Sequence, residues 1–273
     1  MSHRPASLMK RFATLVGAAL AVLAASGAAL ASVQSATTPT TAATLSTPAQ
    51  LRVVTANLAF RGNPGVAEDW KTIGPEADIV FVQEAKNVVL RDILNLDTWI
   101  VRQDTSSDAV QGSAVVIRRS VVQSAGELVL VKGVDANDCD DPVLGGIMTR
   151  WLARVDVQLN NGRWLRVASL HMPPARCQNG IGSPYAVMAD NVVAFAKRSD
   201  RLLVLGADWN KVVDDDPNDI GARTGLKPRG PDEGTRIDGF YVSQAISTND
   251  LYKLAQTGSD HRPVKMTITV PAP

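Results

Sequence analysis

The chain has 273 residues, of which 45 % are hydrophobic and 20 % are charged, so it can bury a sizeable core. Its 28 basic residues nearly balance its 27 acidic residues, which argues against a protein held to nucleic acid by bulk positive charge. The spacing of the two cysteines matches no zinc-binding pattern, and the sequence contains no HExxH motif, so nothing indicates a zinc site.

The N-terminal segment has the pattern of a secretory signal peptide. Lys10 and Arg11 precede an apolar run from Phe12 to Ala25, and Ala29-Leu30-Ala31 follows as a cleavage site of the small-residue type. We expect residues 1–31 to be removed and the protein to be secreted, with no stable membrane association afterwards. The alternative is an uncleaved anchor, because the run approaches the roughly 20 residues that span a bilayer. Cleavage removes three basic and no acidic residues, which leaves a formal charge of −2.

Residues 32–50, SVQSATTPTTAATLSTPAQ, form a linker rich in Thr, Ala and Pro. The segment carries no charge and almost no large apolar side chain, so it cannot bury enough surface to fold. We expect a flexible tether here and a folded domain over residues 51–273.

Past residue 50, apolar runs alternate with Gly, Pro, Asn and Asp. The runs predicted as strands are LRVVTAN, DIVFVQE, SAVVIRR, ELVLVKG, RWLARVDVQL, RWLRVASLH, RLLVLGA, IDGFYVS and VKMTITV. ARVDVQL and KMTITV alternate as half-buried strands do, whereas DIVFVQ and LLVLGA are continuously apolar, as strands covered on both faces are. Asn-Gly in LNNGRW predicts a hairpin over residues 151–170.

Helical spacing occurs in AEDWKTIG, KNVVLRDIL and YAVMADNVVAFAKRS. In the last of these, Val187, Val192, Phe195 and Ala196 can share one face. Together the elements predict an α/β sandwich with two packed sheets and helices outside. No internal repeat and no glycine-rich nucleotide loop is present in the sequence.

The two cysteines lie in polar, loop-like stretches, DANDCDDP and PARCQNG. Export to an oxidising compartment would allow a Cys139–Cys177 disulfide, and the alternative is a pair of free thiols. The distance on which the bond depends is not encoded in the spacing.

Acidic and amide side chains follow the ends of apolar runs, where a scaffold delivers side chains to a site. Glu84 ends a run too apolar for a surface strand, so an ionised carboxylate there needs a cation, although a solvent-facing glutamate is the alternative. Asn57 ends the first strand and could place its carbonyl near a metal while its amide holds Glu84, or serve as a plain turn residue. Such oxygen ligands suit magnesium or manganese.

Asp208 and Asn210 are two residues apart, so in an extended segment their side chains face the same side. The carboxylate could then activate a water while the amide steadies a phosphoryl oxygen; the alternative is a capped turn. Beyond the leader, the histidines are His171, before Pro173-Pro174, and His261, after Asp260.

A carboxylate beside an imidazole orients the ring and favours its charged form, which suits an anionic phosphate. Asp238, at the start of IDGFYV, is the better candidate to hydrogen-bond His261, because adjacent residues of a strand point to opposite faces. A lone histidine is more often structural, but both of these occupy motif positions.

The ordered set TANL, VQEA, SLHMPP, GADWN, IDGFYVS and SDHRPV resembles the endonuclease/exonuclease/phosphatase superfamily, which includes pancreatic-type deoxyribonuclease, exonuclease III, sphingomyelinases and inositol-polyphosphate phosphatases. The resemblance covers nearly everything from 51 to 270. Each motif is weak alone, whereas six in family order are strong. The resemblance implies a four-layer, deoxyribonuclease I-like α/β sandwich with mixed sheets and divalent-metal-dependent hydrolysis of a phosphoester.

The resemblance also implies roles for the metal-binding residues. Glu84 and Asn57 would serve a Mg²⁺ or Mn²⁺ ion, and Asp260 would be a second metal ligand or a partner of the neighbouring histidine. His171 stands where the exonuclease III branch has a tyrosine motif, so the chain is more similar to the deoxyribonuclease and sphingomyelinase branches. The former supports this histidine with a glutamate, and the candidate here, Gln111, bears no charge, so we expect a weaker proton donor.

By the same motif match, Asp208 and Asn210 would serve the water and the phosphate, and His261 with Asp238 would form an acid/base or phosphate-orienting pair. Arg150, in IMTRW, resembles a phosphate-contacting arginine, the alternative being a surface arginine. Arg61, in the loop after the first strand, could touch a nucleic-acid backbone, the alternative being a solvated loop.

These observations predict a secreted, metal-dependent endonuclease that hydrolyses DNA, and RNA as a second candidate, with little sequence preference. A sphingomyelin or phospholipid phosphodiesterase would need an exposed aromatic hairpin, and aromatics are only 5 % of the chain. An inositol-phosphate phosphatase would carry a tryptophan- and cysteine-containing motif that is absent. The remaining alternatives are the nuclease subunit of a secreted toxin complex and a catalytically dead binding protein; we expect a monomer.

Overall fold

The structure is a computed structural model that describes residues 47–106, 112–137, 139 and 146–273. The predicted signal peptide, and the predicted linker up to residue 46, lie outside the described residues. The first strand begins at Ala49, so the two last residues assigned to the linker belong to the fold, and Gln50 pairs with Thr269. Across the described ranges, no helix combines the length and apolar character needed to cross a membrane.

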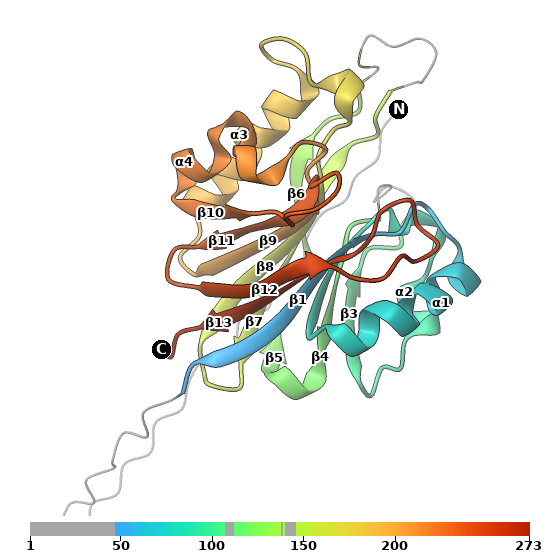
Figure 1. Cartoon of the computed structure of the whole chain (residues 1–273), viewed down its shortest axis with the longest axis vertical. Helices are drawn as coiled ribbons and strands as arrows, with labels where there is room; N and C mark the ends of the chain where they lie inside the picture. Colours follow the sequence, from blue (N-terminus) through green and yellow to red (C-terminus); the bar gives the residue numbers. More distant parts are fainter. Residues whose placement is uncertain (1–46, 107–111, 138, 140–145) are drawn as a thin grey trace, which may run out of the picture. The chain divides into compact units, whose positions relative to one another are not determined.

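Six strands form the first sheet, in the order β12-β13-β1-β2-β4-β3 (Figure 1). β1 and β2 run parallel, and the other neighbours run antiparallel. The strand bounds are β1 Ala49–Asn57, β2 Ile79–Gln83, β3 Trp99–Gln103, β4 Ala114–Arg118, β12 Ser247–Lys253 and β13 Val264–Val270.

The second sheet follows the order β10-β11-β9-β8-β7-β5, and β6 also pairs with β7. β8 and β9 are parallel, whereas β7 and β8 form the antiparallel hairpin predicted from Asn-Gly. The strand bounds are β5 Val122–Ala125, β6 Val129–Val134, β7 Arg150–Leu159, β8 Trp164–His171, β9 Leu202–Asp208, β10 Leu226–Arg229 and β11 Asp238–Ser243.

Helices cover the outer face of each sheet, which completes four layers and confirms the predicted architecture. α1 (Asn63–Ile73) and α2 (Leu90–Ile93) pack on the first sheet through a core that includes Trp70 and Leu90. α3 (Pro184–Lys197) and α4 (Ile220–Thr224) cover the second sheet through a core that includes Met188 and Ile220. A third core lies between the sheets.

The sequence of α3 explains its ends and its buried face. Ser183 Oγ accepts a hydrogen bond from the Ala186 N–H, and Pro184 stands in the first turn, where its missing N–H costs nothing. Val192 and Phe195 are buried as predicted, but Val187 is 38 % exposed. The prediction for Val187 was wrong because the buried stripe is centred on Met188 instead.

Alternation along the strands decides which side chains enter the core between the sheets. On β1, Val53 faces the other sheet, whereas Val54 faces α1. On β9, Val204 faces the other sheet, whereas Leu205 faces α3. Because the side-chain period is two, the last residues of these strands, Asn57 and Asp208, fall on the face that points between the sheets.

Candidate active site

Three predicted site residues form one row across neighbouring strands of the second sheet. His171 ends β8, Asp208 ends β9 and Asp238 begins β11. The strand register places His171 opposite Asp208 and Asp238 opposite Asp208. The motifs meet because β8 and β9 are parallel while β11 runs back beside them.

A layer of buried polar side chains separates this row from the apolar core between the sheets. Gln83 Nε2 donates a 3.0 Å hydrogen bond to Ser169 Oγ, which links β2 to β8. Thr55 Oγ1 donates to Gln83 Oε1 at 3.2 Å, and Ser169 Oγ donates to the Val82 carbonyl at 2.7 Å. The layer is satisfied by its own hydrogen bonds, so it gives the site a rigid floor.

Asp208 is the centre of the site and is 2 % exposed. Its Oδ2 accepts a 3.1 Å hydrogen bond from Asn57 Nδ2 and lies 3.3 Å from His171 Nε2 and 3.8 Å from His261 Nε2. Burial alone would raise the pKa of Asp208, but the charges and hydrogen bonds around it, led by those of His171, outweigh burial and lower the pKa. The carboxylate therefore stays ionised and can accept a proton.

His261 and Asp238 form the predicted pair, with 2.8 Å between His261 Nδ1 and Asp238 Oδ2. Burial would lower the pKa of His261, but its hydrogen bond to Asp238 and the nearby carboxylate charges raise it to about 9. Burial raises the pKa of Asp238 to about 6, and the charge of Asp208 acts in the same direction. At a pH between these two pKa values, His261 is an imidazolium and Asp238 a carboxylate. The ring then donates its Nδ1 proton to Asp238, and its Nε2 is directed at Asp208.

His171 lies between two carboxylates, since its Nε2 contacts Asp208 and its Nδ1 is 3.6 Å from Glu84 Oε1. The Nδ1 atom is buried and has no hydrogen-bond partner. Gln111, expected near this histidine, lies outside the described residues. Glu84 itself has left-handed backbone with φ of 55°, which costs a non-glycine residue roughly 1–3 kcal/mol and persists where the surroundings impose it.

Two predicted amide roles need correction. Asn57 Nδ2 donates to Asp208 rather than to Glu84, and Asn57 Oδ1 accepts the Ala59 N–H at 2.9 Å. Asn210 is not extended, since its φ is 52°. Its backbone N–H donates to Asp208 Oδ1 and its side-chain amide donates to the Met172 carbonyl, each at 2.9 Å. Both asparagines therefore orient groups around the carboxylate, Asn57 from the end of β1 and Asn210 from a left-handed turn after β9.

Arg150, at the start of β7, is 6 % exposed, so the surface alternative is wrong. Its Nε and Nη1 atoms are buried and have no hydrogen-bond partner. Burial lowers its pKa to about 10, and the charges of Glu84 and Asp208 oppose this shift. A guanidinium that keeps two free donors beside these carboxylates is suited to bind a phosphoryl group.

Two other predicted residues are not part of this group. Asp260 is exposed and acts on His261 through its charge. Arg61 lies 3.4 Å, at Nε, from a carboxylate oxygen of Asp69 on α1, so its charge is directed inward instead of toward a substrate. Adjacency in the sequence placed Asp260 near the histidine, but its side chain is exposed in the bend before β13.

The donor set fits a divalent cation. Asp208, Asp238 and His261 offer ligand atoms within 4.8 Å of one another, and Asp238 Oδ1 is buried without a hydrogen-bond partner. The Glu84 carboxylate accepts no hydrogen bond from the part of the chain that is described, and the Asn57 carbonyl oxygen is already used. Carboxylate oxygens are hard ligands, and those of this group lack a full set of positively charged partners. They therefore match magnesium or manganese better than a softer metal.

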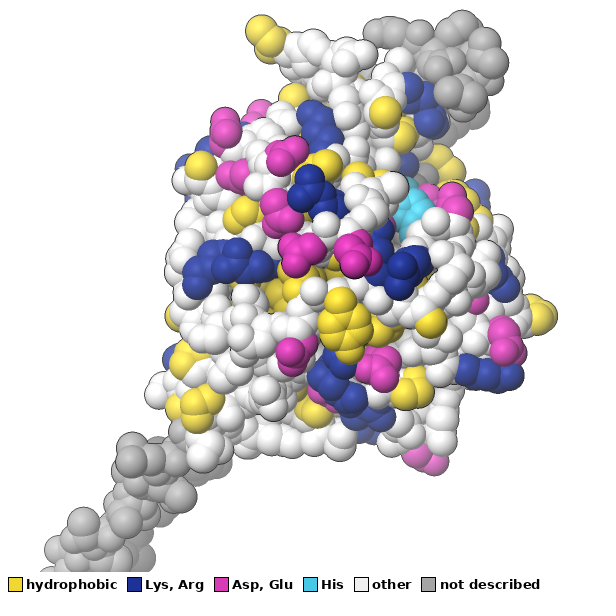
Figure 2. Space-filling model, viewed as in Figure 1, with side chains coloured by type: hydrophobic (Ala, Val, Ile, Leu, Met, Phe, Trp, Pro, Cys, Tyr) yellow, Lys and Arg dark blue, Asp and Glu magenta, His cyan; other side chains and the backbone are white. Residues whose placement is uncertain are grey.

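The site reaches the protein surface through His261 rather than His171. The side chain of His261 is 19 % exposed, compared with 6 % for His171. In the space-filling view a histidine side chain is visible at the surface among acidic and basic side chains (Figure 2). A substrate that enters from this side would therefore meet His261 before the buried carboxylate.

Sequence reasoning missed the polar floor and the support behind His261. Gln83 and Ser169 are polar residues on largely apolar runs, one and two positions before predicted site residues, so their positions were a usable signal. Asp69 gave no such signal, because it lies on a helix and contacts a loop 189 residues later in the chain.

Comparison with known proteins gives one family. A model of the endonuclease/exonuclease/phosphatase family matches residues 47–261. No curated protein matches the sequence significantly.

Several solved structures with this fold are distant in sequence. A family protein from Bacteroides thetaiotaomicron is 17 % identical, with a TM-score of 0.57 over 83 % of this chain and 100 % of that chain. A mannosyl-6-phosphatase from the same bacterium is 18 % identical, with a TM-score of 0.55 over 80 % and 99 %. ANGEL2, a 2′,3′-cyclic phosphatase solved with adenosine-2′,3′-vanadate, is 12 % identical, with a TM-score of 0.57 over 82 % and 96 %. At these identities the likeness concerns the fold.

Proposed function

Because this chain belongs to the endonuclease/exonuclease/phosphatase family, whose members are phosphoric ester hydrolases, we propose that it is a metal-dependent phosphodiesterase that cleaves DNA with little sequence preference. The observation that carries the proposal is that the buried cation Arg150 lies within electrostatic reach of Asp208, which the charged His261–Asp238 pair also faces. These groups match the needs of phosphodiester hydrolysis: a proton acceptor, a proton donor and a cation for the phosphoryl oxygens.

The residues have distinct proton roles. Asp208, ionised and held by Asn57 and the Asn210 N–H, accepts a proton from the attacking water. His261, protonated and oriented by Asp238, donates its Nε2 proton to the leaving-group oxygen. Arg150 binds a non-bridging oxygen of the phosphate through its free donors. His171 holds the Asp208 and Glu84 carboxylates in place.

Glu84 would hold a Mg²⁺ or Mn²⁺ ion, as the motif match implies, and the free oxygen of Asp238 is a second available ligand atom within the group of Asp208, Asp238 and His261. Such an ion supplies positive charge that stabilises the charge gained by the phosphoryl oxygens. Family members generally use a divalent metal, which agrees with this donor set.

A nucleic acid is the proposed substrate because His171 occupies the middle motif, because the chain carries a leader typical of export and because the domain is compact. RNA is a second nucleic-acid candidate. A sphingomyelin or phospholipid phosphodiesterase remains the alternative enzyme, and the named neighbours add small phosphomonoesters to the substrates that should be assayed. The large exposed apolar side chains are dispersed through the sequence and include Phe60, Met148 and Ile181.

Export is proposed from the leader at residues 1–31, and the Cys139–Cys177 disulfide supports it because such bonds persist in oxidising compartments. We expect a secreted monomer. Co-purification with other secreted chains would instead favour the toxin-subunit alternative, in which partner proteins deliver the nuclease.

Plasmid nicking tests the proposal. Protein comprising residues 32–273 would be assayed with Mg²⁺, with Mn²⁺ and with chelator, beside His261→Ala, Asp208→Asn and the exposed-site control Glu127→Gln. Loss of a proton donor or acceptor should lower the rate at least ~100-fold, while the control keeps it. Near-normal nicking by both site variants would rule out the assignment. If a folded protein leaves plasmid intact but hydrolyses sphingomyelin in liposomes or mannose 6-phosphate, that compound would replace DNA as the proposed substrate.

A further inference from the structure

A buried carboxylate connects helix α1 to the loop that carries His261. Asp69 is 3 % exposed, and its Oδ2 lies 3.4 Å from Arg61 Nε, in the loop after β1. Its Oδ1 accepts a 2.8 Å hydrogen bond from the Gly258 N–H, in the loop between β12 and β13. One side chain therefore fixes two loops that lie far apart in the sequence of the domain.

The Arg61 guanidinium occupies the space that side chains at two glycines would need. A Cβ atom on Gly258 would overlap Nη1 and Cζ of Arg61, and a Cβ on Gly65 would lie 2.7 Å from its Nε. The Arg61 N–H donates to the Leu58 carbonyl at 3.0 Å, so the backbone of this arginine is also restrained. Arg61 is packed between two segments and is 28 % exposed, unlike a cation that reaches into solvent for a substrate.

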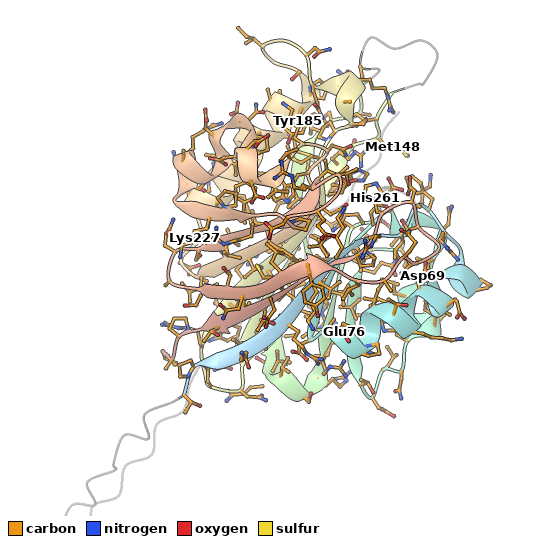
Figure 3. The ribbon with its side chains drawn as sticks, viewed as in Figure 1. Asp69, Glu76, Met148, Tyr185, Lys227 and His261 are labelled. Atoms are coloured by element: carbon orange, nitrogen blue, oxygen red, sulfur yellow. A yellow bond between two sulfur atoms is a disulfide. The ribbon has the colours of Figure 1, made fainter. Side chains whose placement is uncertain are left out.

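The restraint on Gly258 continues to His261 through Ser259. Ser259 is 4 % exposed, and its Oγ accepts a 3.1 Å hydrogen bond from the His261 N–H. In Figure 1 the loop between β12 and β13 extends toward α1, and Figure 3 labels Asp69 on that helix and His261 on the loop. The contacts form a continuous path from α1 to the backbone of His261.

We propose that Arg61 and Asp69 are positioning residues that fix the loop of residues 254–263 so that His261 stays between Asp238 and Asp208. The inference rests on the proposed function for its kinetic consequence. A substrate-binding Arg61, as expected from the sequence, would act on substrate affinity and raise KM. A positioning Arg61 acts on the geometry of the reacting groups and lowers kcat, because a misplacement of about 1 Å can cost ~100-fold.

The kinetic test compares Arg61→Ala, Asp69→Asn and the control Glu68→Gln, which changes the exposed neighbour of Asp69 on the same helix. The full chain is assayed on bis(p-nitrophenyl) phosphate, a small diester without flanking phosphates. We expect kcat to fall about 10- to 100-fold in both test variants with KM unchanged, and no change in the control. An unchanged kcat in a folded Arg61→Ala protein, with or without a raised KM, overturns the proposal.

A second measurement needs no turnover. Heteronuclear NMR of the ¹³C-labelled full chain should show one sharp His261 ring signal in the wild type and in Glu68→Gln, and shifted or broadened signals in Arg61→Ala. Identical His261 signals in the wild type and Arg61→Ala overturn the proposal. A wild type that hydrolyses no diester would count against the proposed function, while the spectra still decide the positioning role. Arg61→Ala also serves if Asp69→Asn does not fold.

Discussion

Burial of the Arg150 guanidinium costs free energy in the protein without substrate. A buried guanidinium normally satisfies its donors, yet two nitrogens of Arg150 have no hydrogen-bond partner. Burial also lowers its pKa, to about 10, which shows that the charged form is disfavoured by its surroundings. The cost is understandable if a phosphoryl group completes the hydrogen bonds, because a preorganised donor stabilises charge most where water is excluded.

Replacing Arg150 should therefore separate stability from activity. We expect Arg150→Met to keep or raise the melting temperature, because the cost of burying this cation exceeds the attraction of Glu84 and Asp208, as its lowered pKa indicates. Activity should fall about 10- to 100-fold, as expected from losing about 1.5–3 kcal/mol of charge-assisted hydrogen bonding. Phosphate should raise the melting temperature of the wild type and not of the variant. A variant as active as the wild type contradicts this role.

Asp156, on β7, should control stability in acid. It accepts hydrogen bonds from Arg166 at 2.7 and 3.0 Å and from Arg154 at 2.9 Å. Burial would raise its pKa, but these hydrogen bonds and charges lower the pKa to about 2 from its ordinary 3.8. A lowered pKa in the folded state stabilises the protein above the ordinary value, and this contribution disappears as the pH falls through about 2.

Urea unfolding of wild type and Asp156→Asn at several pH values checks this behaviour. The variant should be less stable at pH 6, and the difference in unfolding free energy should shrink as the pH is lowered from about 4 toward 2. A difference that stays constant over that range would show that the ion pairs contribute nothing specific to the carboxylate.

At the scale of elements, the apolar runs of the sequence located the strands that build the centre of the sandwich. β2 and β9 are continuous apolar strands buried on both faces, and β7 alternates as predicted. The strands β3, β5, β10 and β12 were not predicted, because they are short or carry many polar side chains at sheet margins.

The candidate site was predictable to the extent that it depends on strand ends. Asp208, Asp238 and His171 meet through strand register, which follows from the hydrophobic pattern. Glu84 and Asn210 were found, but their orientations were not, because each lies in a left-handed turn that no local pattern encodes. The contacts of Asp69 with Arg61 and Gly258 were missed because together they join two loops to a helix through tertiary packing alone.

Packing of the two sheets depends on a residue without a side chain. Gly206, on β9, stands where a Cβ atom would overlap the ring of Phe81 on β2. Phe81 is fully buried and packs edge-on against Phe240, with 6.0 Å between ring centroids, so it has little room to move. The glycine sets how closely β9 approaches β2, and that approach also brings Asp208 to Asn57.

Gly206→Ala should lower the free energy of unfolding by about 1–3 kcal/mol, as overpacked cores do. The matched control is Gly62→Ala, where φ is −78° and the nearest atom to a new Cβ is 3.9 Å away. The control should be close to neutral, because the lower backbone entropy of the unfolded chain offsets the loss of a glycine at the N-cap of α1. Denaturant unfolding of both variants checks the contrast, and equal effects would contradict the proposed close approach.

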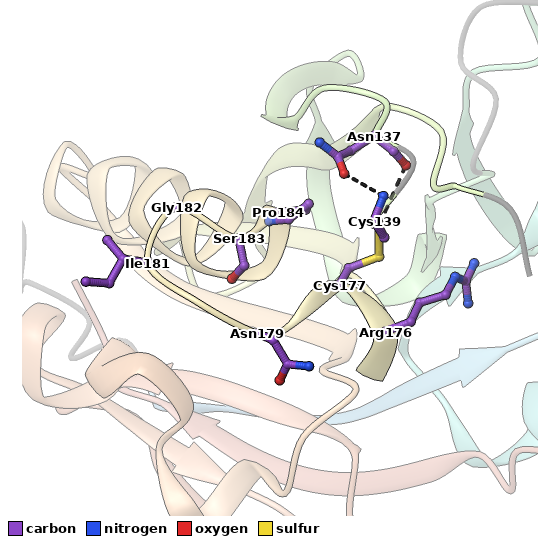
Figure 4. A pocket seen from close by; sticks show the side chains of 9 residues that line it. All are labelled: Asn137, Cys139, Arg176, Cys177, Asn179, Ile181, Gly182, Ser183 and Pro184. Atoms are coloured by element: carbon purple, nitrogen blue, oxygen red, sulfur yellow. Dashed lines mark hydrogen bonds between the residues drawn. A yellow bond between two sulfur atoms is a disulfide. The ribbon is translucent and has the colours of Figure 1, made fainter. Parts of the chain in front are cut away.

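At the scale of the whole molecule, the disulfide connects the chain before β7 to the short turn η4 (Ala175–Cys177) after β8. Asn137 Oδ1 accepts the Cys139 N–H at 2.7 Å beside it. The bond lines a polar cavity of about 500 Å³ that also includes Asn179 and Ser183 (Figure 4). Both segments flank strands that supply site residues, so the bond stabilises the surroundings of Arg150 and His171.

Replacing both cysteines by alanine should lower the free energy of unfolding by about 2–4 kcal/mol, because the bond closes a loop of 38 residues. Guanidinium unfolding of the oxidised wild type and the double variant measures the difference. Reducing agent should destabilise the wild type and leave the double variant unchanged. A wild type that is insensitive to reduction would contradict a structural role for the bond.

The last strand of the chain, β13, lies between β12 and β1, inside the first sheet. A polypeptide is synthesised from its N-terminus to its C-terminus, so more than two hundred residues are added between β1 and the strand that pairs with its second edge. Until then, that edge of β1 has no partner. Asn57 and Asp208 are already synthesised by then, but His261 and the strand after it arrive last. The strand order therefore determines when the first sheet can be completed. The full site cannot assemble earlier, because His261 lies directly before β13 in the chain.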